Sequence, residues 1–154
     1  GEIEGVKIEG FHFGNSPAEI QMAKRLTPKM VMRTTSGTQG VVGCTHAEGI
    51  LVASFVVAEA TFQHILDKNP SHVTFIVTGR KNGDEDLALA EYLQKRLEGR
   101  DVPLEPYLDR VSASPGGIKY HRSEDPSFHQ SDLELALQVN RFSFSMEVIN
   151  KVTT

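Results

Sequence analysis

The sequence has a single cysteine, no long apolar run and no cluster of basic residues, and each absence excludes a class of protein. Cys44 has no second cysteine to pair with, and no Cys/His grouping has the spacing of a structural zinc site. We therefore expect a reducing, cytoplasmic environment. The longest apolar stretch, residues 49–58, has about half of the roughly 20 residues that cross a bilayer, so no membrane span is predicted.

The charge pattern gives no indication of a nucleic-acid partner. The 16 basic residues are scattered along the chain and the formal net charge is −4, whereas nucleic-acid-binding proteins concentrate positive charge on one face. A length of 154 residues with 39% hydrophobic and 23% charged residues is typical of one folded domain. The chain does not begin with Met, and no basic segment followed by an apolar run indicates a signal peptide.

Apolar residues recur with two alternating periods along the chain, which predicts an α/β fold. Strands are expected where apolar residues alternate or run continuously, and helices where they recur every three to four residues. The expected strands span residues 6–13, 29–33, 50–54, 72–77 and 141–148, and the expected helices span residues 18–26, 39–47, 57–66, 84–97 and 131–137. Loops are expected at residues 79–83, 111–117 and 121–127. This order favours one layered α/β/α domain over residues 1–154, with a largely parallel or mixed sheet.

A segment rich in hydroxyl groups, within residues 31–40, separates an expected strand from an expected helix. This segment, the hydroxyl loop, consists of Thr34, Thr35, Ser36, Gly37 and Thr38. Backbone N–H groups in such a turn can converge on an anion, and a helix N-terminus adds partial positive charge. Arg33 precedes the loop and is a candidate partner for two phosphate oxygens. We interpret the loop as an oxyanion or phosphate cradle. An ordinary turn is the alternative, because the lysine of a P-loop is missing.

A second candidate binding segment, the Asn15 loop, covers residues 14–17. Asn15 offers an amide and Ser16 a hydroxyl to a ligand, and Pro17 restricts the backbone. The same residues also predict a helix start, with Ser16 as N-cap, Pro17 at the first helical position and Glu19 three residues after the cap. Both interpretations remain open from the residues alone. His12 lies immediately upstream and is a further candidate to face a pocket.

Three carboxylates, on Asp84, Glu85 and Asp86, crowd the start of the helix expected over residues 84–97. Carboxylates of this kind hold Mg²⁺ together with water and substrate phosphate. The positive end of a helix dipole favours the same charges without any metal, so the sequence leaves both explanations open. Cys44 lies in an apolar stretch, and we expect it to be a packed side chain rather than a nucleophile.

Several of these segments resemble the 2-phosphosulfolactate phosphatase family. Residues 10–19, Gly-Phe-His-Phe-Gly-Asn-Ser-Pro-Ala-Glu, resemble its GFDxGNSPxE segment, and residues 33–40, Arg-Thr-Thr-Ser-Gly-Thr-Gln-Gly, resemble its TT-N/S-GT segment. Residues 51–55, 84–87 and 132–144 are similar to later parts of the family pattern. The chain departs from that pattern at His12, where the family usually has Asp, and it has no counterpart of the upstream D-x-x-R-A-T-type segment. We therefore expect the C-terminal part of a longer phosphatase-like protein.

The resemblance implies Mg²⁺-dependent hydrolysis of a phosphate monoester, 2-phosphosulfolactate, in the pathway to coenzyme M. It implies that Asn15, Ser16, Arg33 and the hydroxyl loop bind substrate, and that Glu85 and Asp86 serve catalysis and hold the metal. The expected partner is a small phosphorylated or sulfonated acid, and homo-oligomer formation is left open. The alternative is a non-catalytic phosphate- or sulfonate-binding or interaction domain.

Overall fold

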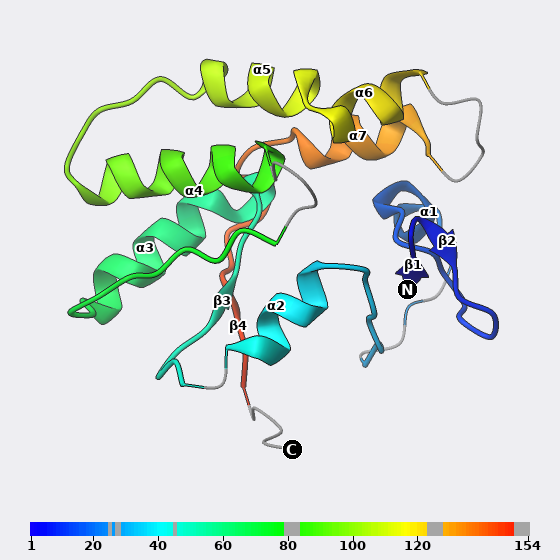
Figure 1. Cartoon of the computed structure of the whole chain (residues 1–154), viewed down its shortest axis with the longest axis horizontal. Coiled ribbons are helices and arrows are strands. Elements are labelled where there is room, and N and C mark those ends of the chain that lie inside the picture. Colours follow the sequence, from blue (N-terminus) through cyan, green and yellow to red (C-terminus); the bar gives the residue numbers. More distant parts are fainter. Residues whose placement is uncertain (25, 27–28, 45, 79–83, 123–127, 150–154) are drawn as a thin grey trace.

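Helices form the largest part of the regular structure, and short antiparallel strands accompany them (Figure 1). The structure is a computed structural model. It describes residues 1–24, 26, 29–44, 46–78, 84–122 and 128–149. In chain order the elements are β1 (Glu2–Ile3), β2 (Val6–Lys7), α1 (Pro17–Gln21), α2 (Gly37–Gly43), β3 (Leu51–Val52), a 3₁₀ turn (Phe55–Val57), α3 (Ala58–Lys68), α4 (Asp84–Leu97), α5 (Glu105–Ala113), α6 (Pro115–Arg122), α7 (Gln130–Ala136) and β4 (Met146–Glu147).

The described strands form two small antiparallel sheets of two strands each. β1 pairs with β2 through a tight turn in which Glu4 and Gly5 have φ values of +57° and +86°. Positive φ at both central residues is the geometry of a two-residue hairpin turn. β3 pairs with β4, with Leu51 opposite Glu147, and so joins distant parts of the chain. The strands predicted over residues 6–13, 50–54 and 141–148 are thus confirmed only over these short portions.

The mixture of helices and strands is confirmed, but the described residues contain no layered parallel sheet. The segments at residues 29–33 and 72–77, which were predicted as strands, run without strand pairing. A strand needs a neighbour along its length to take up its backbone hydrogen bonds. The Arg33 carbonyl accepts one such bond from the Glu2 N–H at 2.9 Å, but no strand of the described residues pairs with either segment. Most of their apolar side chains are exposed, with Val31 at 82% and Ile76 at 58%, whereas Phe75 is partly buried against the core.

The two long predicted helices are confirmed. α4 has the predicted bounds, and its terminal charges suit the helix dipole, with three carboxylates in the first turn and Lys95 and Arg96 in the last. Gly99, at φ +77°, ends it in the left-handed conformation common at helix C-termini. α3 begins after the 3₁₀ turn and ends at Asn69, which has φ +44°. No helix in the described part of the chain is long and apolar enough to cross a membrane.

The shorter helices differ from the predictions at their ends. α1 ends at Gln21 rather than at Leu26, and none of its residues is buried, so no apolar face extends it. α2 begins at Gly37, two residues before the predicted start, and ends at Gly43. α7 lies within one residue of its predicted bounds.

The loop predicted over residues 111–117 is wrong, because α5 and α6 meet there at a sharp corner. The Ser114 hydroxyl donates to the Val111 carbonyl at 2.7 Å and accepts from the Gly117 N–H at 3.0 Å. A Cβ on Gly117 would lie only 2.3 Å from that carbonyl oxygen, so glycine permits the close approach of the two helices. The predicted loop at residues 79–83 lies outside the described residues, as does the 123–127 part of the loop predicted at residues 121–127.

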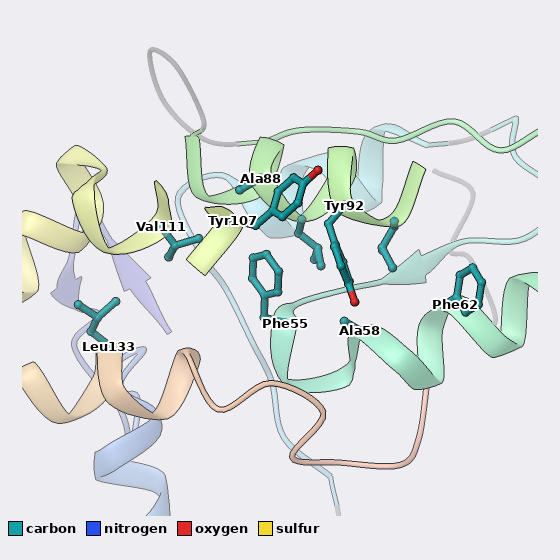
Figure 2. Packing of buried hydrophobic residues seen from close by; sticks show 10 residues of the cluster. Phe55, Ala58, Phe62, Ala88, Tyr92, Tyr107, Val111 and Leu133 are labelled. Carbon is teal, nitrogen blue, oxygen red and sulfur yellow. The ribbon is translucent and has the colours of Figure 1, made fainter. Parts of the chain in front are cut away.

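The core lies between α3, α4 and α5, and it extends to α7 (Figure 2). In Figure 1, α5 lies above α4 and α3 below it, while α6 and α7 form the far end, with α1 below α7. Three aromatic rings gather at the centre, with ring centroids 6.2 Å apart between Phe55 and Tyr92 and 5.4 Å apart between Tyr92 and Tyr107. This helical block supports the loops that carry the predicted site residues.

Candidate functional site

The hydroxyl loop is closed by its own side chains. The Thr38 N–H donates to the Thr34 hydroxyl at 3.0 Å, and the Thr38 hydroxyl donates back to the Thr34 carbonyl at 3.1 Å. Thr34 is buried, so these bonds are shielded from water and fix the turn before α2. The hydroxyls of Thr34 and Thr38 therefore shape the loop.

Thr35 is held by a carboxylate that the sequence analysis missed. Glu2 is buried, and its two carboxylate oxygens accept the Thr35 N–H at 2.6 Å and the Thr35 hydroxyl at 2.8 Å. The Gly5 N–H donates to the same carboxylate at 2.6 Å. Burial opposes the charge on Glu2, but the hydrogen bonds from Gly5 and Thr35, with the nearby Arg33 charge, outweigh it and lower the Glu2 pKa. An ionised carboxylate thus occupies the anion-binding groups of Thr35.

Ser36 and Gly37 remain available at the start of α2. Ser36 is the N-cap residue, yet its hydroxyl makes no capping hydrogen bond. The first N–H groups of a helix have no acceptor within it, and in α2 the Thr38 N–H is taken by Thr34 and the Gln39 N–H by the Ser36 carbonyl, so the Gly37 N–H is the one that can turn to an outside acceptor. Arg33 is directed back to the chain, with Nη1 donating to the carbonyls of Glu2 at 3.1 Å and Thr34 at 3.3 Å.

The Asn15 loop has the predicted cap and an additional long-range bond. The Glu19 N–H donates to the Ser16 hydroxyl at 3.0 Å, which confirms Ser16 as N-cap. The Glu19 carboxylate accepts from the Gly14 N–H at 2.8 Å, so the reciprocal bond of the capping box reaches beyond Ser16. The Ser16 hydroxyl donates in turn to Asp132 on α7 at 2.7 Å. Asn15 is exposed, and so is His12.

Glu85 and Asp86 face different neighbours at the start of α4. Asp86 accepts two hydrogen bonds from Thr78, at 3.2 Å from its N–H and 3.1 Å from its hydroxyl. A Cβ placed on Gly116 would lie 3.5 Å from a Glu85 carboxylate oxygen, so Glu85 lies near the start of α6. A Cβ on Gly40 would lie 2.3 Å from the Thr78 methyl group, so Thr78 packs closely against α2 while it donates to Asp86.

The Tyr120 phenol on α6 is affected by carboxylates from three separate segments. Burial raises the pKa of the Tyr120 phenol, and the negative charges of Asp132, Glu2 and Glu85 raise it further. These carboxylates belong to α7, β1 and α4, so the Tyr120 phenol is within electrostatic reach of one residue from each of these elements. Within the described ranges, no three Asp, Glu, His or Cys side chains come close enough together to hold a metal ion.

Known proteins are similar in sequence to most of this chain. The family model for 2-phosphosulpholactate phosphatase matches residues 1–114. The chain belongs to the 2-phosphosulfolactate phosphatase family. A probable 2-phosphosulfolactate phosphatase of Bacillus subtilis is 29% identical over 151 residues, which cover 96% of this chain and 66% of that protein. A probable 2-phosphosulfolactate phosphatase of Thermotoga maritima is 29% identical, with 99% and 70% covered. No solved structure matches the chain.

This family match includes both predicted loops and the start of α4, but it ends before two of the residues that surround them. Asp132 and Tyr120 lie beyond residue 114, and Glu2 lies within the match. Sequence reasoning missed all three. Asp132 stands in the first turn of α7, where a carboxylate is ordinary, and the partner of Glu2 is 33 residues away. No local pattern could have indicated either contact.

Two shallow clefts lie away from this site. One is formed by α4, α5 and the segment between them, including Glu91, Tyr107 and Arg110. The other lies between α3 and residues 140–145, including His64. Neither cleft contains a predicted site residue.

Proposed function

We propose that this chain is a Mg²⁺-assisted phosphatase, or a part of one, that hydrolyses a small phosphate monoester. The observation that carries the proposal is the family match over residues 1–114, supported by relatives named as probable 2-phosphosulfolactate phosphatases. We therefore propose 2-phosphosulfolactate as the substrate, with a cytoplasmic role in the pathway to coenzyme M. Since the chain spans 66% and 70% of those two relatives, the activity of the whole relatives comes to it only as a proposal.

The proposed substrate site is the hydroxyl loop together with Asn15, Ser16 and Arg33. The Ser36 hydroxyl and the Gly37 N–H would donate to phosphate oxygens, because neither makes a hydrogen bond to another described residue. The remaining members, Thr34, Thr35 and Thr38, keep the loop in shape. Exposed Asn15 would orient the rest of the substrate from the neighbouring loop.

The carboxylates proposed for catalysis and metal binding are Glu85 and Asp86. Glu85 accepts no hydrogen bond from another described residue, whereas one oxygen of Asp86 is taken by Thr78. This donor set fits Mg²⁺, which often has one or two protein carboxylates and otherwise water and phosphate oxygens as ligands. Bound there, the ion would neutralise phosphate charge and acidify a water molecule. Glu85 would orient an attacking water, whose oxygen would bond to phosphorus as the ester P–O bond breaks; the proton of the water would pass to solvent, and the leaving alcohol oxygen would take up a proton from solvent.

Phosphate release from 2-phosphosulfolactate, measured with and without Mg²⁺, tests this proposal. We expect Glu85→Gln and Ser36→Ala each to lower kcat/KM at least about tenfold, the effect of losing about 1.4 kcal/mol of transition-state stabilisation. Asp109→Asn is the matched control, because Asp109 is an exposed carboxylate on α5. Turnover that is independent of Mg²⁺ and insensitive to both site variants would refute the proposal.

The second candidate function is a non-catalytic phosphate- or sulfonate-binding domain. It is favoured by His12, an exposed residue next to the Asn15 loop that stands where the family pattern has an Asp, so one carboxylate of that pattern is missing. This alternative predicts binding of phosphate or sulfate without any release of phosphate from 2-phosphosulfolactate. Calorimetry with inorganic phosphate measures binding, and the phosphate-release assay on the same preparation measures turnover. Turnover eliminates the alternative, whereas binding without turnover supports it.

A further inference from the structure

Asp132 is a buried carboxylate whose contacts belong to the opposite end of the chain. It is 5% exposed, and no ion pair joins it to another described residue. A single oxygen, Oδ1, accepts both the Ser16 hydroxyl at 2.7 Å and the Ala18 N–H at 2.9 Å. A buried carboxylate without partners is costly, so these two bonds from α1 are what satisfy Asp132 in its position.

The same bonds are what α1 needs at its N-terminus. α1 has five residues and buries none of them, and a helix this short is not stable by itself. The Ala18 N–H is one of the N–H groups that a helix leaves without an internal partner. Ser16 caps the helix from within the chain, and Asp132 adds a second cap from α7.

These contacts fix the backbone on both sides of Asn15. On one side, the Gly14 N–H donates to Glu19 at 2.8 Å, and on the other side Ser16 is bonded to Asp132. The Asn15 side chain is exposed between them and makes no hydrogen bond to another described residue. Its direction is therefore set by the bonds of its two neighbours.

We propose that Asp132 is the positioning residue that holds the Asn15 loop ready for substrate, acting through Ser16 and Ala18. The proposal rests on the proposed function in that it takes the Asn15 loop to be part of the substrate site. Asp132 is not placed to act as a catalytic group, because its bonded oxygen faces α1 and the side chain is buried. It lies beyond residue 114, so a residue outside the family match orders a segment within it.

The decisive experiment compares Asp132→Ala with Asp132→Asn in the present chain. The amide oxygen of asparagine can still accept both hydrogen bonds, whereas alanine accepts neither. We expect Asp132→Ala to raise the KM for 2-phosphosulfolactate about tenfold with kcat within about twofold, since binding rather than chemistry is disturbed. Asp132→Asn should restore KM to within about threefold of the parent, and Asp109→Asn should leave both constants unchanged. A role of the negative charge itself would make Asn as harmful as Ala, which would overturn the proposal.

Two further measurements keep the test independent of folding and of the proposed reaction. If Asp132→Ala does not fold, Ser16→Ala replaces it, and an unchanged KM in that variant overturns the proposal. If the parent chain hydrolyses no substrate, the proposed function fails, and the dissociation constant for inorganic phosphate becomes the readout. A tenfold weaker affinity in the Ala variant, restored by Asn, then supports the positioning role, and an unchanged affinity overturns it. In either case the double variant Ser16→Ala/Asp132→Ala should lose less binding free energy than the sum of the losses in the two single variants, because both act on the same hydrogen bond.

Discussion

Replacing Glu2 by glutamine should destabilise the protein by removing the acceptor that joins the β1–β2 hairpin to the hydroxyl loop. The carboxylate takes three donors, two from Thr35 and one from Gly5. A glutamine amide keeps one oxygen but presents an NH₂ group on the other side, so at least one N–H faces a donor instead of an acceptor. Leaving a buried donor unpaired costs about 1–3 kcal/mol, and we expect a loss of about 2 kcal/mol for Glu2→Gln at neutral pH.

The assay is urea denaturation of the parent, of Glu2→Gln and of the control Glu9→Gln, which changes an exposed carboxylate nearby. At about 2–4 °C per kcal/mol for a chain of this size, Glu2→Gln should also lower Tm by about 4–8 °C. The control should stay within about 0.5 kcal/mol of the parent.

The pH dependence gives the sharper test. The Glu2 pKa in the folded protein is lowered from its ordinary value of 4.5, so the unfolded chain binds this proton more readily than the folded one. The Glu2 contribution is therefore fully present above pH 4.5, and it is lost as the pH falls through the lowered folded pKa. The difference in unfolding free energy between parent and Glu2→Gln should shrink in that acid range. A difference near zero at neutral pH, or one that grows on acidification, would refute the reasoning.

Three other substitutions probe the helical block. Thr61→Val should raise the free energy of unfolding by about 1 kcal/mol, because the Thr61 hydroxyl is buried and has no hydrogen-bond partner among the described residues. A less stable variant would mean that the hydroxyl is bonded. Arg96→Gln should lower the free energy of unfolding by about 1–1.5 kcal/mol, because it removes the ion pair with Glu59 and the cation–π contact 3.9 Å from the Phe62 ring centroid. Arg100→Gln, which changes an exposed arginine, should leave the free energy of unfolding almost unchanged. Gly117→Ala should lower Tm, because overpacking at this position costs about 1–3 kcal/mol of unfolding free energy. The control Gly43→Ala has open space around its Cβ position and should raise Tm slightly, since alanine favours a helix more than glycine does. Equal Tm changes for the two glycine variants would contradict the close approach at the α5–α6 corner.

The parts of the fold that could be predicted are those with local signals. α4 has its carboxylates, apolar stripe and C-terminal Gly99 within one stretch of sequence, so its bounds were predicted correctly. The corner between α5 and α6 was missed, because Pro115 and Gly117 are typical of a plain turn. In the structure Pro115 begins a helix and Gly117 allows backbone contact. Strand pairing joins residues far apart in sequence, as Leu51 and Glu147 do, and periodicity does not reveal it.

The candidate site shows the same division between local and distant contacts. Ser16 was identified as a cap and the hydroxyl loop as a turn before a helix, since both depend on neighbours within a few residues. The internal bonds of the loop and its anchor on Glu2 could not be predicted, because hydroxyl-rich sequence does not tell which hydroxyls are already engaged. The roles of Glu85 and Asp86 in catalysis and metal binding stay a prediction.

The bond between Ser16 and Asp132 spans 116 residues, and this separation has a consequence for the order of folding. The Glu2–Thr35 contact closes a loop of 33 residues, and by chain entropy the longer loop costs about 1 kcal/mol more to close. The hydroxyl loop can therefore be anchored while the chain is still being synthesised, whereas the Asn15 loop waits until α7 has left the ribosome. The Asn15 loop is therefore made before the hydroxyl loop but ordered after it, and slow synthesis of the C-terminal part would lengthen the time during which the Asn15 loop is accessible to proteases.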